Sequence, residues 1–317
     1  MRIHLLAATA TAIAALAFAA CAPKAETPVA AATTAAPVAA PTIAPFAASA
    51  DVHPFTIGTF QAAALRDGGF QPANDNKTIA INKKKADVDA ALKANGLPTD
   101  KLELSLQPMI VRTADKVFLF DTGAGSQMGA AAGKLPATLA SASIDPATIT
   151  DIFISHSHGD HVGGLIDAKG ALAFPNAAIH MSANEWKALQ ADKTMAALVT
   201  AITPKVATFG AGTDVVPGVK AIDIKGHTPG HSGYLITSGD QSLLYQGDVM
   251  HHSIISVQQP DWTIAFDGDA PTAQASRKAV LEAWAASGQR IYAVHFPFPG
   301  LGKYEKSGDH FVWVAEK

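Results

Sequence analysis

The chain has 317 residues, of which 48% are hydrophobic and 16% are charged, and its formal net charge is −3. A nucleic-acid-binding surface needs clustered positive charge, and the one cationic run is Lys83-Lys84-Lys85, so the composition disfavours a nucleic-acid partner. A single cysteine, Cys21, excludes an intrachain disulfide and a cysteine-rich zinc module. Any metal site must therefore use carboxylates and some of the 12 histidines.

The first 21 residues have the features of an export signal. An apolar run over residues 5–20 follows Arg2, and it is too short to span a membrane comfortably. It ends in Phe18-Ala19-Ala20-Cys21, which resembles a bacterial lipobox, whose cysteine is lipidated after cleavage. We therefore predict a lipoprotein signal over residues 1–21, with an ordinary cleaved secretory signal as the alternative. Either signal predicts export to the periplasm, and the alanine at position 22 favours the outer membrane.

Residues 22–50 are rich in alanine, proline and threonine and carry almost no charge. Such a segment cannot bury enough surface to offset the entropy lost on ordering, so we predict a flexible linker. Residues 51–317 then form the folded part, and their number suits one large domain.

Short apolar strands alternate with helical patterns from residue 55 onward, which predicts a mixed α/β fold and excludes a helical bundle or an all-β sandwich. The predicted strands cover residues 55–57, 107–112, 116–120, 151–155, 178–181, 219–224, 233–237, 242–246, 290–295 and 311–314. The predicted helices cover residues 87–94, 184–190, 193–202 and 272–287. Polar residues follow several of these strands, where the sites of layered α/β proteins gather.

The densest polar group follows the strand predicted at 151–155. It consists of His156, His158, Asp160 and His161, and imidazole and carboxylate are the standard ligands of zinc and similar ions. His156 and His158 are two residues apart, so on an extended backbone they point the same way. Asp160 and His161 turn toward a second position. One loop can therefore supply ligands to two neighbouring metal ions.

The spacing His-x-His-x-Asp-His resembles the signature of the metallo-β-lactamase superfamily. The family's other elements follow the same order in this chain, as Asp121-Thr122-Gly123, the run 226–232 around His227, Gly247-Asp248 and Val294-His295. The resemblance covers residues 53–317 and implies a four-layer αββα sandwich.

The resemblance also implies a dinuclear centre that holds two divalent ions, most readily Zn²⁺, although manganese, iron and cobalt remain open. It assigns His156, His158 and His227 to one ion. It assigns Asp160, His161 and His295 to the other ion, and Asp248 to a bridging position shared with a nucleophilic hydroxide. Around them, Asp121 would orient the histidine loop, and His231 would lie beside the ligands without being one.

The resemblance is closest to the methyl parathion hydrolase and lactonase-like group, because Asp248 argues against a true β-lactamase and residues 295–302 resemble that group's tail. Lactonases often carry a tyrosine three residues after the bridging aspartate, whereas this chain has His251 there. We expect catalytic roles for Asp160, Asp248 and His251. The candidate pocket residues are aromatic, with core packing as their alternative role: Trp186, Trp262, Phe296 and Phe298.

Together these observations predict an exported dinuclear hydrolase of small neutral esters, with a lactone, an aryl ester or a phosphotriester as substrate. Membrane association would occur only through the lipid on Cys21, and the oligomeric state is left open. The alternatives are a thioesterase similar to glyoxalase II and a surface lipoprotein that uses the fold for binding alone.

Overall fold

The structure is a computed structural model that describes residues 43–317. The predicted signal, including Cys21, lies outside the described residues, as does the predicted linker up to residue 42. In the described remainder of that linker, Phe46 is 4% exposed and packs in a hydrophobic core, with the Arg112 guanidinium 4.3 Å from its ring. Packing against the domain therefore begins before residue 51. None of the helices in the described part is long and apolar enough to cross a membrane.

The first of two seven-stranded sheets is built from the amino-terminal half of the described chain. Its strands, in spatial order, are β1 (Val52–Ile57), β2 (Phe60–Leu65), β5 (Met109–Arg112), β6 (Val117–Phe120), β7 (Asp151–Phe153), β8 (Ala178–Ser182) and β9 (Val206–Phe209). The pairs from β1 to β6 are antiparallel, and those from β6 to β9 are parallel. The strands predicted at 107–112 and 116–120 are β5 and β6, which form an antiparallel hairpin.

The second sheet is built from the carboxyl-terminal half. Its strands, in spatial order, are β10 (Asp214–Val216), β11 (Val219–Asp223), β12 (Ser232–Ser238), β13 (Gln241–Tyr245), β14 (Ile291–Tyr292), β15 (Leu301–Ser307) and β16 (His310–Ala315). Neighbouring strands are antiparallel except β13 and β14. The strand predicted at 290–295 ends at Tyr292, and His295 lies on the turn that follows.

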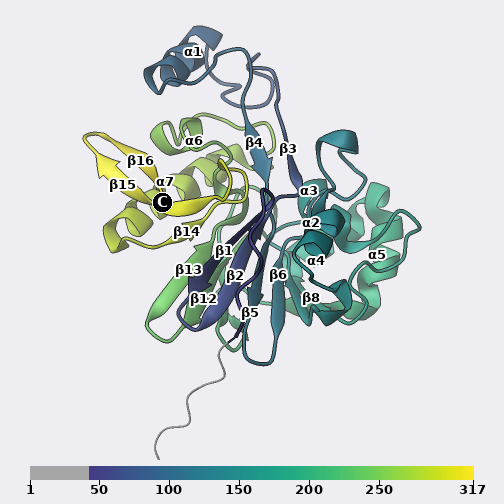
Figure 1. Ribbon diagram of the computed structural model, residues 1–317. Helices are drawn as coiled ribbons and strands as arrows, with labels where there is room; N and C mark the ends of the chain where they lie inside the picture. The colour runs from purple at the N-terminus through teal and green to yellow at the C-terminus, as the bar shows by residue number, and fades with distance from the viewer. Residues whose placement is uncertain (1–42) are drawn as a thin grey trace, which may run out of the picture. The chain divides into compact units, whose positions relative to one another are not determined.

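The two sheets are flanked by two sets of helices (Figure 1), and three hydrophobic cores hold these layers together. An aromatic core that includes Phe120, Phe153 and Tyr234 fills the space between the sheets. Helices α2 (Leu135–Ser141), α4 (Ala183–Ala191) and α5 (Ala196–Ile202) cover the outer face of the first sheet. Helices α6 (Ile255–Gln258) and α7 (Ala270–Ser287) pack against the second sheet. The predicted αββα sandwich is confirmed.

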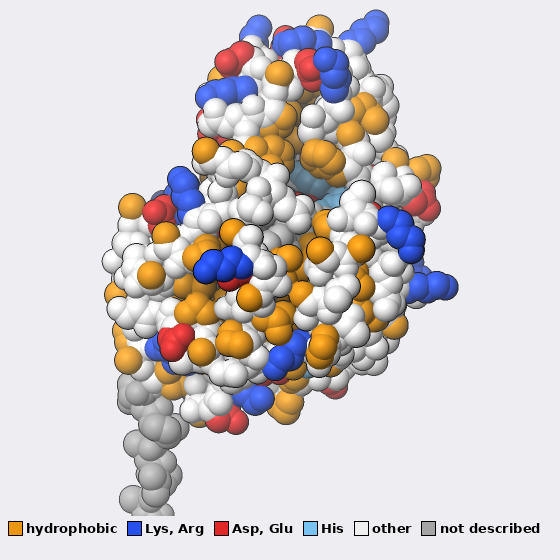
Figure 2. Space-filling view, turned by 90° about the vertical axis from the view of Figure 1, so that its right-hand side faces the viewer, with side chains coloured by type: hydrophobic (Ala, Val, Ile, Leu, Met, Phe, Trp, Pro, Cys, Tyr) orange, Lys and Arg blue, Asp and Glu red, His pale blue; other side chains and the backbone are white. Residues whose placement is uncertain are grey.

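A smaller lobe rises from one end of the sandwich. The ribbon of β3 (Gly68–Phe70) and β4 (Leu104–Leu106) leads to α1 (Lys85–Ala94), whose Leu92 packs with Ile79 and Trp262. Figure 2 shows histidine side chains at the floor of a hollow between this lobe and the sandwich. The lobe therefore borders the opening through which a ligand would reach those histidines.

Candidate metal centre

Seven side chains from both sheets meet at one end of the sandwich. Four belong to the loop after β7 and the short helix α3 (Gly159–Val162), and the others follow β11, β13 and β14. The structure brings them into two adjoining groups, namely His156, His158, His227 and Asp248, and Asp160, His161 and His295. These are the seven residues that the family resemblance assigned to two metal ions.

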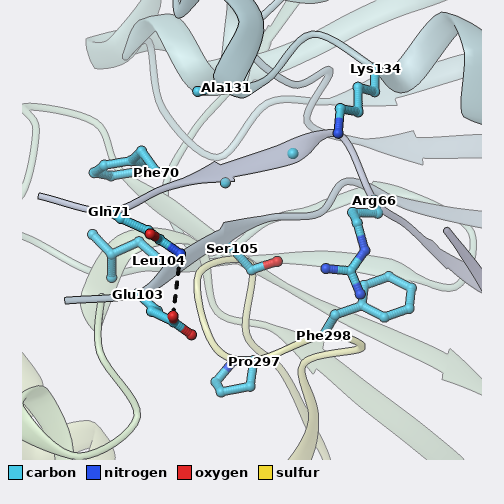
Figure 3. A pocket seen from close by; sticks show the side chains of 12 residues that line it. Arg66, Phe70, Gln71, Glu103, Leu104, Ser105, Ala131, Lys134, Pro297 and Phe298 are labelled. Atoms are coloured by element: carbon cyan, nitrogen blue, oxygen red, sulfur yellow. Dashed lines mark hydrogen bonds between the residues drawn. The ribbon is translucent and has the colours of Figure 1, made fainter. Parts of the chain in front are cut away.

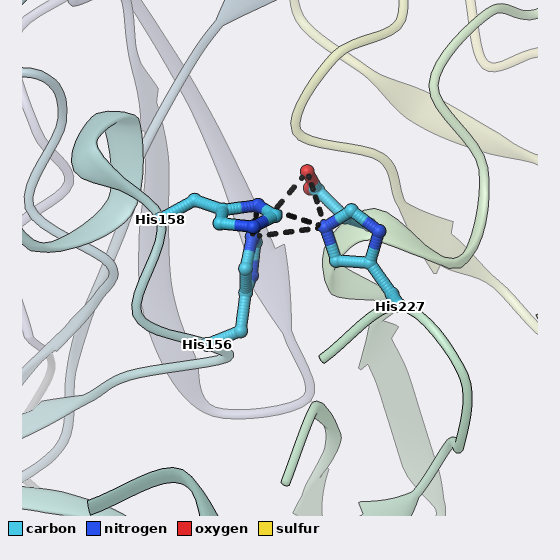
Figure 4. Close-up of side chains that lie close together, drawn as sticks. His156, His158 and His227 are labelled. Atoms are coloured by element: carbon cyan, nitrogen blue, oxygen red, sulfur yellow. Dashed lines mark hydrogen bonds and ion pairs between the residues drawn. The ribbon is translucent and has the colours of Figure 1, made fainter. Parts of the chain in front are cut away.

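The first group presents three imidazole nitrogens to a common point (Figure 4). His156 Nε2 lies 3.0 Å from His158 Nδ1, and His227 Nε2 lies 3.2 Å and 3.1 Å from these two atoms. Zinc–nitrogen bonds of about 2.0–2.1 Å in a tetrahedron place ligand nitrogens roughly 3.3 Å apart, close to what is seen here. The spacing therefore suits three ligands of one ion.

The second group lies around His161 Nε2, which is 3.5 Å from Asp160 Oδ2. His295 Nε2 approaches the same Asp160 oxygen at 3.6 Å. The Asp248 carboxylate lies between the groups, with Oδ1 3.4 Å from His161 Nε2 and Oδ2 3.6 Å from His156 Nε2. The Asp248 carboxylate thus faces both ligand groups.

Two buried polar atoms in the cluster lack a hydrogen-bond partner in the described structure. His161 Nε2 and Asp248 Oδ1 are both buried without a hydrogen-bond partner in the described structure, and such atoms are rare unless an ion or water satisfies them. Burial lowers the pKa of His156 well below its usual value and that of His227 to about 4, so both imidazoles are neutral at neutral pH. Neutral imidazoles such as these two are typical ligands of a zinc-type ion.

Asp121 fixes the orientation of the histidine loop, as the resemblance implied. Its Oδ2 accepts hydrogen bonds from His161 Nδ1 and Ser155 Oγ, both at 2.7 Å, and from the Tyr245 hydroxyl at 2.8 Å. Its Oδ1 accepts one from the Ser155 backbone N–H. Because Nδ1 of His161 is engaged by Asp121, Nε2 is left for the cluster.

His231 lies beside the cluster and outside both ligand groups. Its Nδ1 donates to the Ile224 carbonyl at 3.1 Å, so Nε2 can accept from the Asp248 backbone N–H at 2.8 Å. A side chain on Gly247, whose φ is +56°, would approach His231 Nε2 to 2.5 Å. This histidine therefore positions the backbone of Asp248.

Glu185 on α4 has a role that the sequence analysis missed. It is fully buried, and each of its carboxylate oxygens accepts two hydrogen bonds. One oxygen binds the backbone and hydroxyl of Ser157, at 2.7 and 2.6 Å, and the other binds Thr228 Oγ1 and the Gly230 N–H, both at 2.8 Å. Glu185 thus joins the loops that carry His156 and His227. In the sequence, the spacing Ser182-x-x-Glu185 is typical of a helix start, where the Ser182 hydroxyl accepts from the Glu185 N–H, and it gives no sign of these loop contacts.

The sequence analysis also missed two residues that support the ligand His227 without belonging to either ligand group. Asp267 faces His227 Nδ1 at 3.0 Å, and Arg277 on α7 binds the other oxygen of Asp267 at 2.9 Å. Both side chains are buried.

His251, for which the sequence analysis expected a catalytic role, lies beside the cluster in the structure. Its ring is buried against the cluster, with Nε2 3.3 Å from Asp248 Oδ2, and it stacks on the His295 ring at 5.6 Å. Neither ring nitrogen has a hydrogen-bond partner in the described structure. His251 therefore lies beside the carboxylate between the two ligand groups, with both ring nitrogens shielded from solvent.

The neighbouring His252 has a structural role. Its Nδ1 accepts from the N–H groups of Ile254 and Ile255, both at 3.2 Å, and so caps the start of α6. Burial lowers the pKa of His252 to about 4.

We expect the His252→Asn variant to lose less stability on mild acidification than the wild type. Since the folded-state pKa is below the ordinary value of about 6.5, the unfolded state binds a proton first, and stability falls as pH drops from 6.5 toward 4. This residue should cost the wild type about 2 kcal/mol between pH 7 and pH 5, and asparagine can accept the same N–H groups without titrating. Urea unfolding at both pH values measures the difference, and equal losses in the two proteins would contradict the assignment.

The four aromatic pocket candidates separate into two classes. Trp186, Trp262 and Phe296 pack in or against hydrophobic cores, the alternative role considered for them. Phe298 lines a cavity of about 680 Å³ together with Phe70 and Arg66, whose guanidinium lies 4.2 Å from the Phe298 ring (Figure 3). The Phe70 ring meets the edge of the His295 ring at 6.2 Å, so this cavity adjoins the second ligand group.

An aromatic side chain that the sequence did not single out lies at the cluster itself. Phe266 is 39% exposed, and its ring centre is 5.9 Å from that of His251. Large hydrophobic side chains with this exposure are few in the described part of the chain, and this one lies beside a candidate catalytic residue. Phe266 is therefore a better candidate for contact with an apolar substrate group than the buried tryptophans.

Comparisons with known proteins agree with this geometry. The family model of the metallo-beta-lactamase superfamily matches residues 108–295, which include all seven clustered side chains. The search of curated proteins finds no match.

Solved structures resemble the chain over most of its length. AidC, a dizinc quorum-quenching lactonase in complex with the product N-hexanoyl-L-homoserine, is 28% identical with a TM-score of 0.80, over 84% of this chain and 97% of that one. The hydrolase AbOPH of the beta lactamase superfamily is 26% identical with a TM-score of 0.75, over 86% and 99%. A probable metal-dependent hydrolase from Staphylococcus aureus, 20% identical with a TM-score of 0.69 over 83% and 99%, shares the fold.

Proposed function

Because the chain belongs to the metallo-beta-lactamase superfamily, we propose that it is a metal-dependent hydrolase of small neutral esters, with lactones as the favoured substrates. The observation that carries this proposal is the convergence of seven ligand side chains into two adjoining groups. The similarity to a dizinc lactonase supports a lactone over an aryl ester or a phosphotriester.

The described residues would hold two divalent ions, which would lower the pKa of water and polarise the carbonyl of the substrate. His156, His158 and His227 would hold one ion and Asp160, His161 and His295 the other, with Asp248 between them. Burial favours the neutral form of Asp160, but His161 and His295 prevail and hold its pKa below the usual range. Since its carboxylate is ionised and 18% exposed, it can accept a hydrogen bond from water.

His251 would act on the substrate side of the reaction. An N–H on its free ring nitrogen can donate to the oxygen that becomes negative when a carbonyl is attacked. Phe266 beside it offers an apolar contact for the substituent of the ester. These two residues give the site a donor and an apolar surface, as an acyl-bearing lactone would require.

The cellular location is a separate proposal. We propose that the protein is exported and anchored through a lipid on Cys21, on the strength of the apolar run 5–20 and the small residues before that cysteine. Globomycin treatment of the native host should leave the leader uncleaved, and a normally processed protein would contradict the lipid anchor.

The activity is tested with the full-length chain loaded with zinc. We expect a γ-lactone to give the highest kcat/KM, above nitrophenyl acetate and a methyl phosphotriester. A chelator should remove activity, and added Zn²⁺ should restore it. Preference for the phosphotriester would overturn the substrate assignment, and no metal-dependent turnover in zinc, manganese or cobalt forms would overturn the enzyme assignment.

The role of His251 predicts a separate loss. We expect His251→Ala to lower kcat on the order of 10²–10³-fold with little change in KM, as found when one oxyanion donor is removed. His251→Tyr, which restores a donor, should recover part of the rate. The control is His310→Ala on β16, outside both ligand groups. Equal loss of activity and bound metal in His251→Ala would indicate a role in metal retention instead.

A further inference from the structure

We propose that Arg277 is a positioning residue that couples the ligand His227 to residues 249–267, the segment that carries His251 and Phe266 at the cluster. The proposal rests on the proposed function only in taking His227 as a metal ligand. It is carried by a buried guanidinium whose three hydrogen bonds go to three separate places along the chain.

The guanidinium of Arg277 is buried on α7, with 1% of the residue exposed. Its Nη2 donates to Asp267 Oδ2 at 2.9 Å, its Nε to the Val249 carbonyl at 2.9 Å, and its Nη1 to the Pro260 carbonyl at 3.0 Å. A buried cation costs free energy unless it is paired and hydrogen-bonded, and here each of the three guanidinium nitrogens donates one hydrogen bond, one of them to a carboxylate. Arg277 therefore differs from an exposed surface ion pair, which contributes little to stability.

The hydrogen bond from Arg277 to Asp267 connects the guanidinium to the candidate metal centre. Asp267 presents Oδ2 to Arg277 and Oδ1 to His227 Nδ1, at 3.0 Å. A proton on Nδ1 is then shared with Asp267, and Nε2 faces His156 and His158. By fixing the Asp267 carboxylate, Arg277 fixes the tautomer and the ring direction of His227.

The other two hydrogen bonds of Arg277 hold residues 249–267 in place. Val249 follows Asp248 directly, and Pro260 lies in the loop after α6, so the two carbonyls are at the start and the middle of residues 249–267. Asp267 is at the end of the same segment. One side chain thus holds the segment at three points, between which His251 and Phe266 are placed.

Lysine could satisfy only part of this arrangement. An ammonium group can pair with Asp267, but it lacks the planar fork that donates in three directions at once. Arg277→Lys should therefore keep the ion pair with Asp267 and lose the hydrogen bonds to the carbonyls of Val249 and Pro260. Arg277→Met should lose both effects. This difference separates the two effects experimentally.

The effect on the metal centre is tested by titrating the full-length metal-free protein with Co²⁺ and recording its visible absorption. We expect Arg277→Met and Asp267→Asn to change the cobalt spectrum similarly and to weaken cobalt binding about 10–100-fold, whereas Arg277→Lys retains the wild-type spectrum. The matched control is Lys278→Met, which removes an exposed charge from the same helix. Wild-type spectra and affinities in both Arg277→Met and Asp267→Asn would overturn the coupling.

The effect on residues 249–267 is tested by amide hydrogen exchange of the zinc-loaded proteins. We expect faster exchange in residues 249–267 for both Arg277→Lys and Arg277→Met, without a change in the β-strands of the first sheet. Uniformly faster exchange would mean general destabilisation and would overturn the proposal, as would wild-type exchange in residues 249–267. Neither experiment uses a substrate, so failure of the proposed hydrolase activity would be distinguishable.

Discussion

Replacing Asp248 with alanine is expected to reduce ester turnover well beyond the ~10–100-fold that loss of an outer partner of a metal ligand costs. Oδ2 of Asp248 lies 3.6 Å from the Nε2 atoms of His156 and His227 and 3.0 Å from that of His295. Its Oδ1 lies 3.4 Å from His161 Nε2. Without it, a negative charge that faces both ligand groups is lost. We therefore expect the variant to hold fewer divalent ions and to lose the turnover that depends on them.

The measurement pairs kcat/KM with metal content by atomic emission. We expect two ions per wild-type chain and a reduced number in Asp248→Ala. The control is Asp240→Ala, which removes an exposed carboxylate from the β12–β13 turn. An Asp248→Ala enzyme that retains two ions and comes within tenfold of the wild-type rate would rule out a bridging role.

Glu185→Gln is expected to destabilise the fold by about 3 kcal/mol, because an isosteric amide turns two acceptor positions into a donor group facing existing donors. The carboxylate accepts four hydrogen bonds from the two ligand loops, two of them from the backbone N–H groups of Ser157 and Gly230. At least one of these buried N–H groups would be left without an acceptor. The loops of His156 and His227 should then separate, and metal affinity should fall as well.

Chemical unfolding of the metal-free protein measures the stability change without the contribution of bound ions. Glu282→Gln makes the same substitution at an exposed position on α7, where its ion pair with Lys306 is solvated and worth little. We expect that control to stay within about 0.5 kcal/mol of the wild type. Equal stabilities for Glu185→Gln and Glu282→Gln would show that the hydrogen bonds of Glu185 to the two loops contribute nothing to the free energy of unfolding.

The candidate ligands between residues 156 and 161 could be predicted from the sequence because imidazole and carboxylate side chains crowd together after one buried strand. The three later ligands were identified only through the family resemblance. His156, His158, Asp160 and His161 lie within one loop, and the remaining ligands sit in short motifs after β11, β13 and β14. Local spacing is visible in a sequence. The αββα architecture followed from the family resemblance, and the alternation of strands and helices alone indicated no more than a mixed α/β fold.

The outer partners could not be predicted, because their contacts join distant parts of the chain. Glu185 lies 28 residues from Ser157 and 45 from Gly230, and the Asp267 contact with His227 spans 40 residues. No periodicity or spacing marks such pairs. Asp121 was found only because the family resemblance includes its Asp-Thr-Gly element.

Some strands were missed for reasons of packing. The segment Phe60–Leu65 contains three alanines, which have low strand propensity, yet Ala62, Ala63 and Ala64 are fully buried between two layers. Small side chains are accommodated there because aromatic and helical layers pack closely on both faces. Strand β15 contains three exposed charged residues, namely Lys303, Glu305 and Lys306. They leave too few apolar residues for a hydrophobicity pattern to indicate a strand there.

The division of the ligands between the two sheets has a consequence for the timing of assembly. As the chain is synthesised, the loop after β7 is complete early, but His227 and Asp248 arrive only with the second sheet, and His295 comes after α7. Full coordination must therefore wait until both sheets have docked. We expect the ions to be captured after the fold forms, adding to its stability by mass action instead of nucleating it.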